Sequence, residues 1–425
     1  MKNILYGGKR KPRLWAVLLI SAMALTLLPV RLSPARAAMP ATGDANDGVD
    51  FAALSTKGNG FYYGAYNHAV GLADGYYGMA IKDGTPTPIL WRVMGEEAGV
   101  GYEGYITALS EYVLDSTNFY TDQSTNVYEN SNIKSVLAAM VADTNNFPTA
   151  ERNGMATVSV VTGMYSGAEM TGPQQPGPVD YPVISAAQTL YLPSGGDLGS
   201  SNVYWEAGNT RNAAYLLAAN QNDNVATLKS GTGGNVIYLT RSPSPSYTNI
   251  AACVTTNGVG IMGRVDYVYG VRPAFKLDPA SVIFASEIAD APTTAGQTLA
   301  DADNYAESAG AANYKLTVLN TALSGGTMTA DEDAFDGSSD HPTVPAASGG
   351  GVSVEAAGAT ASTKLTYKIV DSDHNIVGYG QGADNAELTV DAKDLAGADL
   401  AGGSYTVYVW AQKNNDIHSH EGSQP

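Results

Sequence analysis

The sequence is poor in cysteine, and this scarcity limits how the fold can be stabilised. Cys253 is the single cysteine among 425 residues, so no internal disulfide can form. A protein without disulfides must rely on its hydrophobic core. Cys253 lies in the apolar run "IAACVTT", which predicts a small buried hydrophobic residue rather than a reactive thiol.

Basic residues are also few. The chain has 23 Lys and Arg against 41 Asp and Glu, a formal charge of -18. Basic residues precede the apolar run 14–30, and Ala35-Arg36-Ala37 follows as a cleavage motif, so residues 1–37 are predicted to be a signal peptide. Its removal takes away seven basic residues and shifts the formal charge to -25. Such a surface repels phosphate backbones and anionic lipids, which argues against nucleic-acid and peripheral membrane binding.

Long apolar runs are missing after residue 30, and so is a cysteine for lipid attachment near the cleavage motif. We therefore expect a secreted, extracellular or cell-surface protein with no integral membrane segment after signal cleavage. The sequence displays no sorting motif, so the mode of cell attachment stays open.

Composition shifts and turn residues divide the rest of the chain. Short alternating runs broken by Gly, Asp, Asn and Pro predict strands, and a stretch rich in Ala, Gly, Asp, Ser and Thr predicts a linker. The expected parts are a polar leader (38–57), a first domain (58–285), a linker with the strand "NYKLTVLN" (286–351), a small β-sandwich (352–415) and a disordered tail (416–425).

Two helices are expected inside the first domain. Ser131 precedes "NIKSVLAAM", where Ile133, Leu137 and Met140 recur at helical spacing. In "SAAQTLY", Ser185 and Gln188 have the spacing of a capping box. Helices inserted early into a mostly antiparallel sheet indicate an α+β domain.

Six motifs in order resemble a family of exported bacterial surface proteins that carry a domain of uncharacterised function. They are "IKDGTPTPILWRVM" with the preceding "YYG", "ALSEYVLDSTNF", "YENSNIKSVL", "YPVISAAQTL", "IYLTRSPSP" and "YGVRPAFKLD". The resemblance spans roughly residues 60–280 and implies a C-type-lectin-like fold, distantly related to formylglycine-generating enzymes. The end of the chain resembles Ig-like modules more loosely. The expected fold is thus a C-type-lectin-like α+β domain followed by an all-β Ig-like sandwich.

The sequence departs from this family at two motifs. The family has an aromatic residue near Thr240 and a tryptophan at the position of Tyr128. Formylglycine-generating enzymes use a cysteine pair, which this chain cannot supply, so that chemistry is excluded. Only one of the five histidines, His68, lies inside the first domain, which makes a Cys/His nucleophile unpromising.

No metal or cofactor is expected. The motifs through which lectins bind calcium are missing, and "DSDHN" (371–375) has Ile376 where an EF-hand loop needs glycine, so we predict a turn between strands. The histidines of "HSHE" (418–421) are assigned to a frayed end. Glu111 and Asp115, inside a family motif, are predicted to be an exposed strand end and a turn cap.

Tyrosine is the excess that points to binding, with 26 Tyr against 7 Phe. Tyrosine suits sugar stacking and protein recognition, and it equally suits half-buried strands, so both interpretations stay open. If recognition occurs, we expect it in the loop region 195–234, where the candidate binding residues are Tyr204, Trp205, Asn220 and Asn222.

Four residues in the matching motifs are predicted to be structural: Trp91, Arg92, Arg241 and Arg272. In "YGVRPAFKLD", alternation places Val271, Phe275 and Leu277 on one strand face and Arg272 on the other. The planar guanidinium of Arg272 is expected to tie this strand to carboxylate or carbonyl groups of neighbouring loops.

The sequence therefore favours a non-enzymatic secreted or cell-surface protein that acts in adhesion or in binding a glycan or a host or cell-surface protein. Two alternatives stay open. One is a hydrolase acting on polysaccharide, which would need two carboxylates across a cleft. The other is an architectural spacer in a surface layer. The ligand and the oligomeric state are left undetermined.

Overall fold

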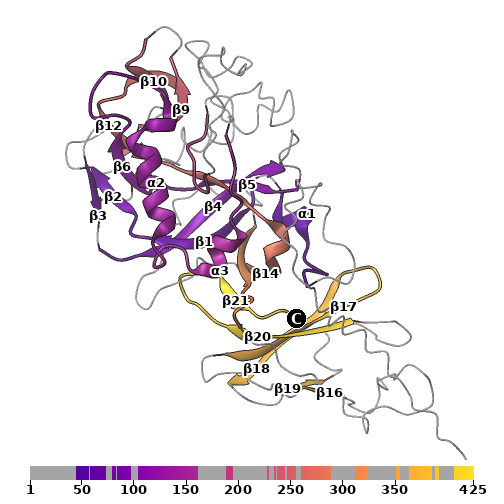
Figure 1. Cartoon of the computed structure of the whole chain (residues 1–425). Coiled ribbons are helices and arrows are strands. Elements are labelled where there is room, and N and C mark those ends of the chain that lie inside the picture. The colour runs from indigo at the N-terminus through magenta and orange to yellow at the C-terminus, as the bar shows by residue number, and fades with distance from the viewer. Residues whose placement is uncertain are drawn as a thin grey trace, which may run out of the picture.

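The computed structural model is mostly β-sheet with few helices (Figure 1). The predicted signal peptide lies outside the described residues. The structure describes residues 45–56, 58–72, 79–82, 84–96, 104–160, 188–194, 227–228, 234–235, 237–244, 247–254, 260–288, 312–323, 351–354, 363–384, 388–391 and 406–425.

The larger sheet runs through most of the described chain. Its main path has the order β13-β5-β4-β1-β15-β21-β20-β17-β18, and β14 pairs with β15 beside this path. The pairs β1·β15 and β15·β21 are parallel and the others are antiparallel, so the sheet is mixed. The strands are β1 (Gly60–Tyr66), β4 (Thr87–Glu96), β5 (Ile106–Ser110), β13 (Ala274–Leu277), β14 (Val282–Ile288), β15 (Asn313–Leu319), β17 (Lys364–Val370), β18 (Ile376–Asp384), β20 (Thr406–Lys413) and β21 (His420–Gly422).

A second sheet of five strands has the order β11-β10-β9-β12-β6 and is also mixed, because β12 and β9 pair in parallel. Its strands are β6 (Asp115–Asn118), β9 (Tyr238–Pro243), β10 (Ile250–Val254), β11 (Gly260–Arg264) and β12 (Val268–Val271). Three two-stranded sheets complete the described pairings: β2 (Ala69–Leu72) with β3 (Ala80–Lys82), β7 (Thr227–Leu228) with β8 (Gly234–Asn235), and β16 (Gly351–Val354) with β19 (Leu388–Asp391).

One of the two expected helices is confirmed. α2 (Asn132–Ala142) begins after Ser131, whose side chain accepts a hydrogen bond from the Lys134 N–H and so caps the helix. The second expected helix, in "SAAQTLY", is wrong over the residues that the structure describes, 188–191, because Gln188 and Tyr191 form β-bridges. The other short helices are α1 (Phe51–Leu54), α3 (Thr149–Gly154), η2 (Tyr128–Asn130) and η3 (Pro279–Ser281).

Aromatic side chains fill the core between the sheets and helices. Trp91 meets Phe275 edge to face with ring centroids 4.5 Å apart, and Tyr63 stacks on Phe275 at 5.4 Å. Such pairs stabilise a core beyond their buried area. Cys253 is free and fully buried, as predicted, and burial raises the pKa of its thiol to about 12. Many tyrosines of the described chain are buried in this core, which supports their structural interpretation there.

The stretch "YGVRPAFKLD" differs from the single half-buried strand that alternation predicted. β12 ends at Val271 in the five-stranded sheet, and β13 begins at Ala274 in the larger sheet. Arg272 and Pro273 carry the chain from one sheet to the other. Both faces are buried, because a strand that passes between two sheets has protein on each side.

The expected division into parts is also different in the structure. Phe51 and Leu54 of the supposed leader are buried in the core, and the strand "NYKLTVLN" is confirmed as β15 in the middle of the larger sheet. The predicted disordered tail is wrong, because β21 lies between β15 and β20. β17, β18 and β20 therefore continue the same sheet as β1, where a separate sandwich was expected.

Candidate ligand-binding pocket

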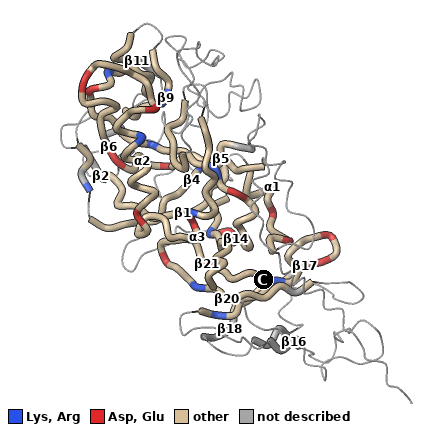
Figure 2. Tube along the Cα trace, in the orientation of Figure 1, with Lys and Arg blue, Asp and Glu red and all other residues tan. Residues whose placement is uncertain are grey.

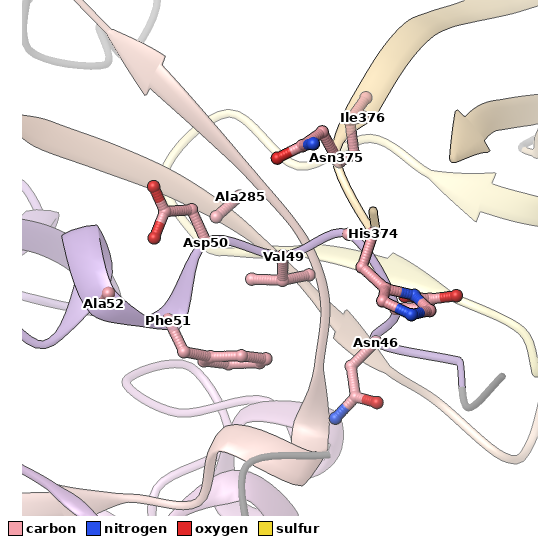
Figure 3. A pocket seen from close by; sticks show the side chains of 11 residues that line it. Asn46, Val49, Asp50, Phe51, Ala52, Ala285, His374, Asn375 and Ile376 are labelled. Carbon is pink, nitrogen blue, oxygen red and sulfur yellow. The ribbon is translucent and has the colours of Figure 1, made fainter. Parts of the chain in front are cut away.

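A pocket of about 670 Å³ opens where three segments that are distant in the sequence meet (Figure 3). The first segment precedes and begins α1, the second is Ala285 on β14, and the third is the turn from β17 into β18. The lining residues are Asn46, Asp47, Gly48, Val49, Asp50, Phe51, Ala52, Ala285, His374, Asn375 and Ile376. Apolar and polar side chains are both present, which is the usual composition of a small-ligand site.

Gly48 allows the first segment to lie close to the β17–β18 hairpin. Its φ of +79° is in the left-handed region. A Cβ at this position would stand 2.7 Å from the Ile376 Cγ1 and 2.9 Å from the Val370 Cγ2. Glycine is therefore required both by the backbone conformation and by the packing that closes one side of the pocket.

Asp47 links this segment to the turn between β17 and β18 and to β20. Its Oδ1 lies 2.9 Å from the His374 Nδ1, and its Oδ2 accepts a hydrogen bond of 2.8 Å from the Tyr408 hydroxyl. The Asp47 side chain is 7% exposed, whereas the His374 side chain is 45% exposed. Asp47 thus has a buried structural role, while the other side of the imidazole ring is open to the pocket.

Lys368 also binds the segment that precedes α1, at Ala45. Its fully buried side chain donates hydrogen bonds from Nζ to the carbonyl oxygens of Ala45 at 2.8 Å and Ile283 at 2.9 Å. The ammonium also lies over the Tyr408 ring, 5.0 Å from its centroid. Burial lowers the pKa of Lys368 to about 7, and the charge of Asp47 opposes this shift.

The turn 371–375 has the geometry of a connection between strands. Asp371 Oδ1 accepts hydrogen bonds from the N–H groups of Asp373 and Asn375, and His374 has a φ of 64°. The carboxylate of Asp371 is therefore engaged with its own turn. Across the described residues, no group of three or more His, Cys, Asp or Glu is placed to hold a metal ion.

Asn46 lines the pocket, and its side-chain oxygen is buried. The residue is only 4% exposed, yet its Oδ1 has no hydrogen-bond partner. A buried acceptor without a donor costs free energy, so such atoms are rare in folded proteins and often mark functional positions. Asp50 lies at the exposed end of the pocket, where its Oδ1 accepts the Ala53 N–H and caps α1.

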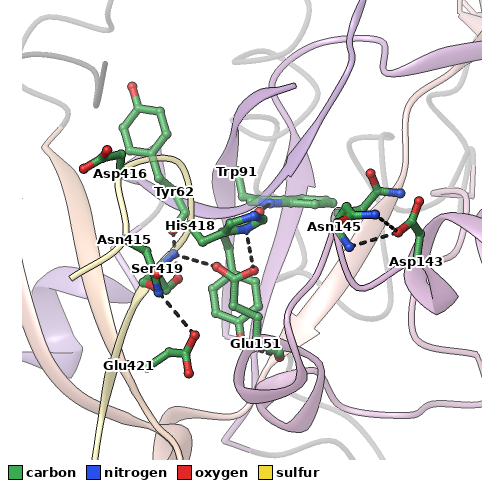
Figure 4. A network of polar contacts seen from close by, with 12 residues as sticks. Tyr62, Trp91, Asp143, Asn145, Glu151, Asn415, Asp416, His418, Ser419 and Glu421 are labelled. Atoms are coloured by element: carbon green, nitrogen blue, oxygen red, sulfur yellow. Dashed lines mark hydrogen bonds and ion pairs between the residues drawn. The ribbon is translucent and has the colours of Figure 1, made fainter. Parts of the chain in front are cut away.

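A second polar cluster contains a serine, a histidine and a glutamate (Figure 4). Glu151 is fully buried, accepts the Ser419 N–H at 2.7 Å and lies 3.3 Å from the His418 Nδ1. The Ser419 hydroxyl donates to the Tyr62 carbonyl oxygen instead of the imidazole. The cluster therefore lacks the serine-to-histidine contact of a hydrolase and instead ties α3 to the C-terminal segment.

The four residues expected in the 195–234 loops, Tyr204, Trp205, Asn220 and Asn222, lie outside the described residues. All four expected structural residues are buried. The Trp91 Nε1 donates to the Tyr63 carbonyl oxygen, and the Arg241 Nη1 donates to the Leu192 carbonyl oxygen.

Arg92 and Glu111 form a buried ion pair, with 2.9 Å between Nε and Oε1. Glu111 is 1% exposed, so the expectation of an exposed strand end is wrong, because the arginine compensates its buried charge. Asp115 was expected to cap a turn. It starts β6 instead, where its Oδ2 pairs with Lys82 at 2.7 Å and accepts the Tyr66 hydroxyl.

The pocket itself was missed by sequence reasoning. Its first segment belonged to the expected leader and its last to the expected sandwich, and no local pattern reports that they meet. The usable local signals were the turn residues "NDG" (46–48) and the polar turn "DSDHN", but each also occurs in ordinary turns.

The described part of the chain is mostly β-sheet with few helices, which is compatible with either the α+β or the all-β fold class. Residues 103–279 match a family model described as "Domain of unknown function (DUF6273)". The expected domain of unknown function is therefore present, over a narrower range than the motifs suggested. Searches of curated proteins and of solved structures gave no match.

The family match runs from β5 to β13, and every residue that lines the pocket lies outside it. No helix in the described part of the chain is long and apolar enough to cross a membrane.

Proposed function

We propose that this chain is an exported, non-enzymatic protein that binds a glycan or protein ligand at the outside of a bacterial cell, through the pocket beside α1. The observation that carries the proposal is a pocket of about 670 Å³ whose lining combines apolar residues such as Val49 and Ile376 with polar ones. The partly exposed His374 ring and the exposed Asp50 carboxylate add polar groups at the opening. These features favour recognition, because Asp47 is already engaged by His374 and Tyr408 and is not available as a catalytic base.

The finer identity of the two parts belongs to the same proposal. A C-type-lectin-like DUF6273 domain related to formylglycine-generating enzymes, an Ig-like C-terminal module, secretion and adhesion are supported by the ordered motifs and the signal-like N-terminus. In this arrangement the DUF6273 domain and the C-terminal strands are joined by one sheet, and the ligand pocket lies between the segment that begins α1, β14 and the turn from β17 into β18.

The test is a binding screen with a blocked pocket. Ala52 is exposed on α1 and lines the pocket, so Ala52→Trp should obstruct it without disturbing the core. Ala138 is exposed on α2, which Figure 1 shows apart from α1, and it is not among the residues that line the pocket, so Ala138→Trp is the matched control. A glycan array and a panel of cell-surface proteins should give ligands that the chain with Ala138→Trp retains and the chain with Ala52→Trp loses. A blank screen with folded protein, or equal binding by both variants, would reject the pocket as the binding site.

An architectural spacer is a second candidate, supported by the continuous sheet from β13 to β18. A protein of this kind self-associates without binding other ligands. Sedimentation at increasing concentration separates the candidates, since a spacer forms large assemblies that the chain with Ala52→Trp forms equally well.

A further inference from the structure

The segment 414–422 closes the larger sheet between two of its strands. β21 pairs in parallel with Thr317–Leu319 of β15 and antiparallel with Gln412 and Lys413 of β20. In the order of described strands it links the part from β13 to β15 with the part from β20 to β18. A strand of three residues forms only a few ladder bonds, so the contacts of the surrounding side chains decide whether it stays in place.

The His420 side chain closes the turn before β21 in a form that a proton would break. Its Nδ1 lies 3.0 Å from the backbone nitrogen of Asn415. A backbone N–H can only donate, so Nδ1 accepts and the neutral imidazole carries its proton on Nε2. A second proton, on Nδ1, would set two donors against each other at this contact.

The charges around His420 oppose that second proton on balance. From β15, the Lys315 Nζ donates to the carbonyl oxygens of Asn415 at 2.8 Å and Asp416 at 2.9 Å. Burial and this neighbouring ammonium lower the pKa of His420 to about 4, and the Asp416 carboxylate opposes the shift. The imidazole therefore takes up a proton much more readily once the segment has left its place.

Other titratable groups also contact the segment (Figure 4). Glu151 of α3 accepts the Ser419 N–H at 2.7 Å and lies 3.3 Å from the His418 Nδ1. A proton on His418 adds attraction to the Glu151 carboxylate, so it favours the closed segment. From β20, Lys413 pairs with Glu421 at 3.2 Å. Figure 2 shows both acidic and basic residues around α3, β21 and β20.

We propose that the segment 414–422 is an acid-sensitive latch, which protonation of His420 releases from between β15 and β20 while the rest of the fold stays closed. The C-terminal strands remain attached, because Lys368 and Tyr408 bind the segment that precedes α1. Release leaves backbone groups of β15 and β20 open to pairing with another strand. This inference is independent of the pocket and goes beyond the proposed function.

The experiment is hydrogen exchange with mass spectrometry on the chain from residue 38 onward, between pH 7 and pH 5, with rates corrected for intrinsic exchange. The released segment takes up a proton near pH 6.5 and the closed segment only near pH 4, so release gains as the pH falls. The released population should rise roughly twentyfold over this range. Protection in 414–423 should fall by the same factor.

Peptides from β1 and β4 report loss of the whole fold and serve as the internal reference. Because the latch opens alone, protection in 414–423 should be at least about tenfold lower than in β1 and β4 at pH 5. Equal protection in these regions would mean that the segment leaves only when the whole fold is lost, which overturns the inference.

His420→Gln is the decisive variant. Glutamine offers an oxygen that can accept the Asn415 N–H and does not titrate, so the fall in protection should shrink to about threefold or less. His418→Gln is the matched control in the same segment and should keep the full response. A full response in His420→Gln, or its loss in His418→Gln, assigns the release to other groups and rejects the latch.

A second measurement covers the case in which His420→Gln does not fold. Proton NMR of the wild-type histidine rings should show one ring, assigned to His420, that titrates well below about 6.5, the ordinary pKa of histidine. A His420 ring that titrates at the ordinary value would show that closing the segment does not exclude the proton, and the inference would fail.

Discussion

Arg272 joins the two main sheets through Ser110. The Arg272 Nε donates to the Ser110 carbonyl oxygen at 2.7 Å, at the end of β5 in the larger sheet. Its Nη1 lies 3.4 Å from the Tyr238 hydroxyl, in β9 of the smaller sheet. The guanidinium is fully buried and lies 5.3 Å from the Tyr238 ring centroid. These contacts are those expected of an internal tie.

Arg272→Ala should lower the unfolding free energy by about 3 kcal/mol or more, because it leaves a buried carbonyl and a cavity at the junction of the sheets. Ligand affinity of the remaining folded protein should change little. Arg264→Ala is the matched control, since Arg264 is partly exposed and pairs with Asp266 two residues away. Its melting temperature should stay close to that of the wild type. A larger effect on affinity than on stability for Arg272→Ala would restore a binding role for this arginine.

Gly48→Ala should destabilise the pocket. The new Cβ would meet Ile376 and Val370 at under 3.0 Å, in addition to the strain of a positive φ. We expect a loss of about 2–3 kcal/mol and weaker ligand binding. Gly84 has a φ of +92° with nothing within 4 Å of its Cβ position, so Gly84→Ala isolates the backbone strain at about 1 kcal/mol. Denaturant titration of both variants measures the difference, and equal losses would show that the packing contact contributes nothing.

Acid should weaken the fold through His420. Burial and the nearby Lys315 lower the pKa of His420 to about 4, and its Nδ1 accepts the Asn415 N–H. The unfolded chain binds this proton near pH 6.5 and the folded chain does not, so stability falls as the pH drops from about 6.5 to 4. The slope attributable to this group is up to about 1.4 kcal/mol per pH unit. His420→Gln should reduce that slope in denaturation measured from pH 4 to 7, and an unchanged slope would assign the acid sensitivity to other groups.

The end of the chain should matter for stability. Deleting 416–425 removes β21, so β15 and β20 lose a shared neighbour and Glu151 loses the Ser419 N–H. The expected loss is more than about 3 kcal/mol. Deleting only Gln424 and Pro425, which follow β21, should have little effect. Melting curves of the two truncations provide the comparison, and similar curves would mean that β21 adds no stability.

Cys253 offers a direct report on unfolding. Its thiol is fully buried and has a pKa raised to about 12, so it should resist alkylation at pH 8 in the native protein. The thiol should react within the denaturant range where the fold is lost. Mass spectrometry after iodoacetamide treatment measures this, and rapid labelling of native protein would show that β10 opens locally.

Local features of this protein were predictable because they depend on neighbours in the sequence. Ser131 and the spacing of Ile133, Leu137 and Met140 specify α2. The alternation of "NYKLTVLN" specifies a strand, and an apolar surrounding run predicts a buried Cys253. Helix capping, strand alternation and apolar burial act over a few residues, so the sequence by itself determined these elements.

Only the tertiary structure decided which elements lie together. Alternation in "YGVRPAFKLD" carries no information that Arg272 stands between two sheets, and charge at Glu111 suggests exposure until Arg92 is placed beside it. The pocket joins Asn46 to His374, more than three hundred residues apart. Burial of a charged group and the path of a chain across sheets depend on long-range packing, which local patterns do not encode.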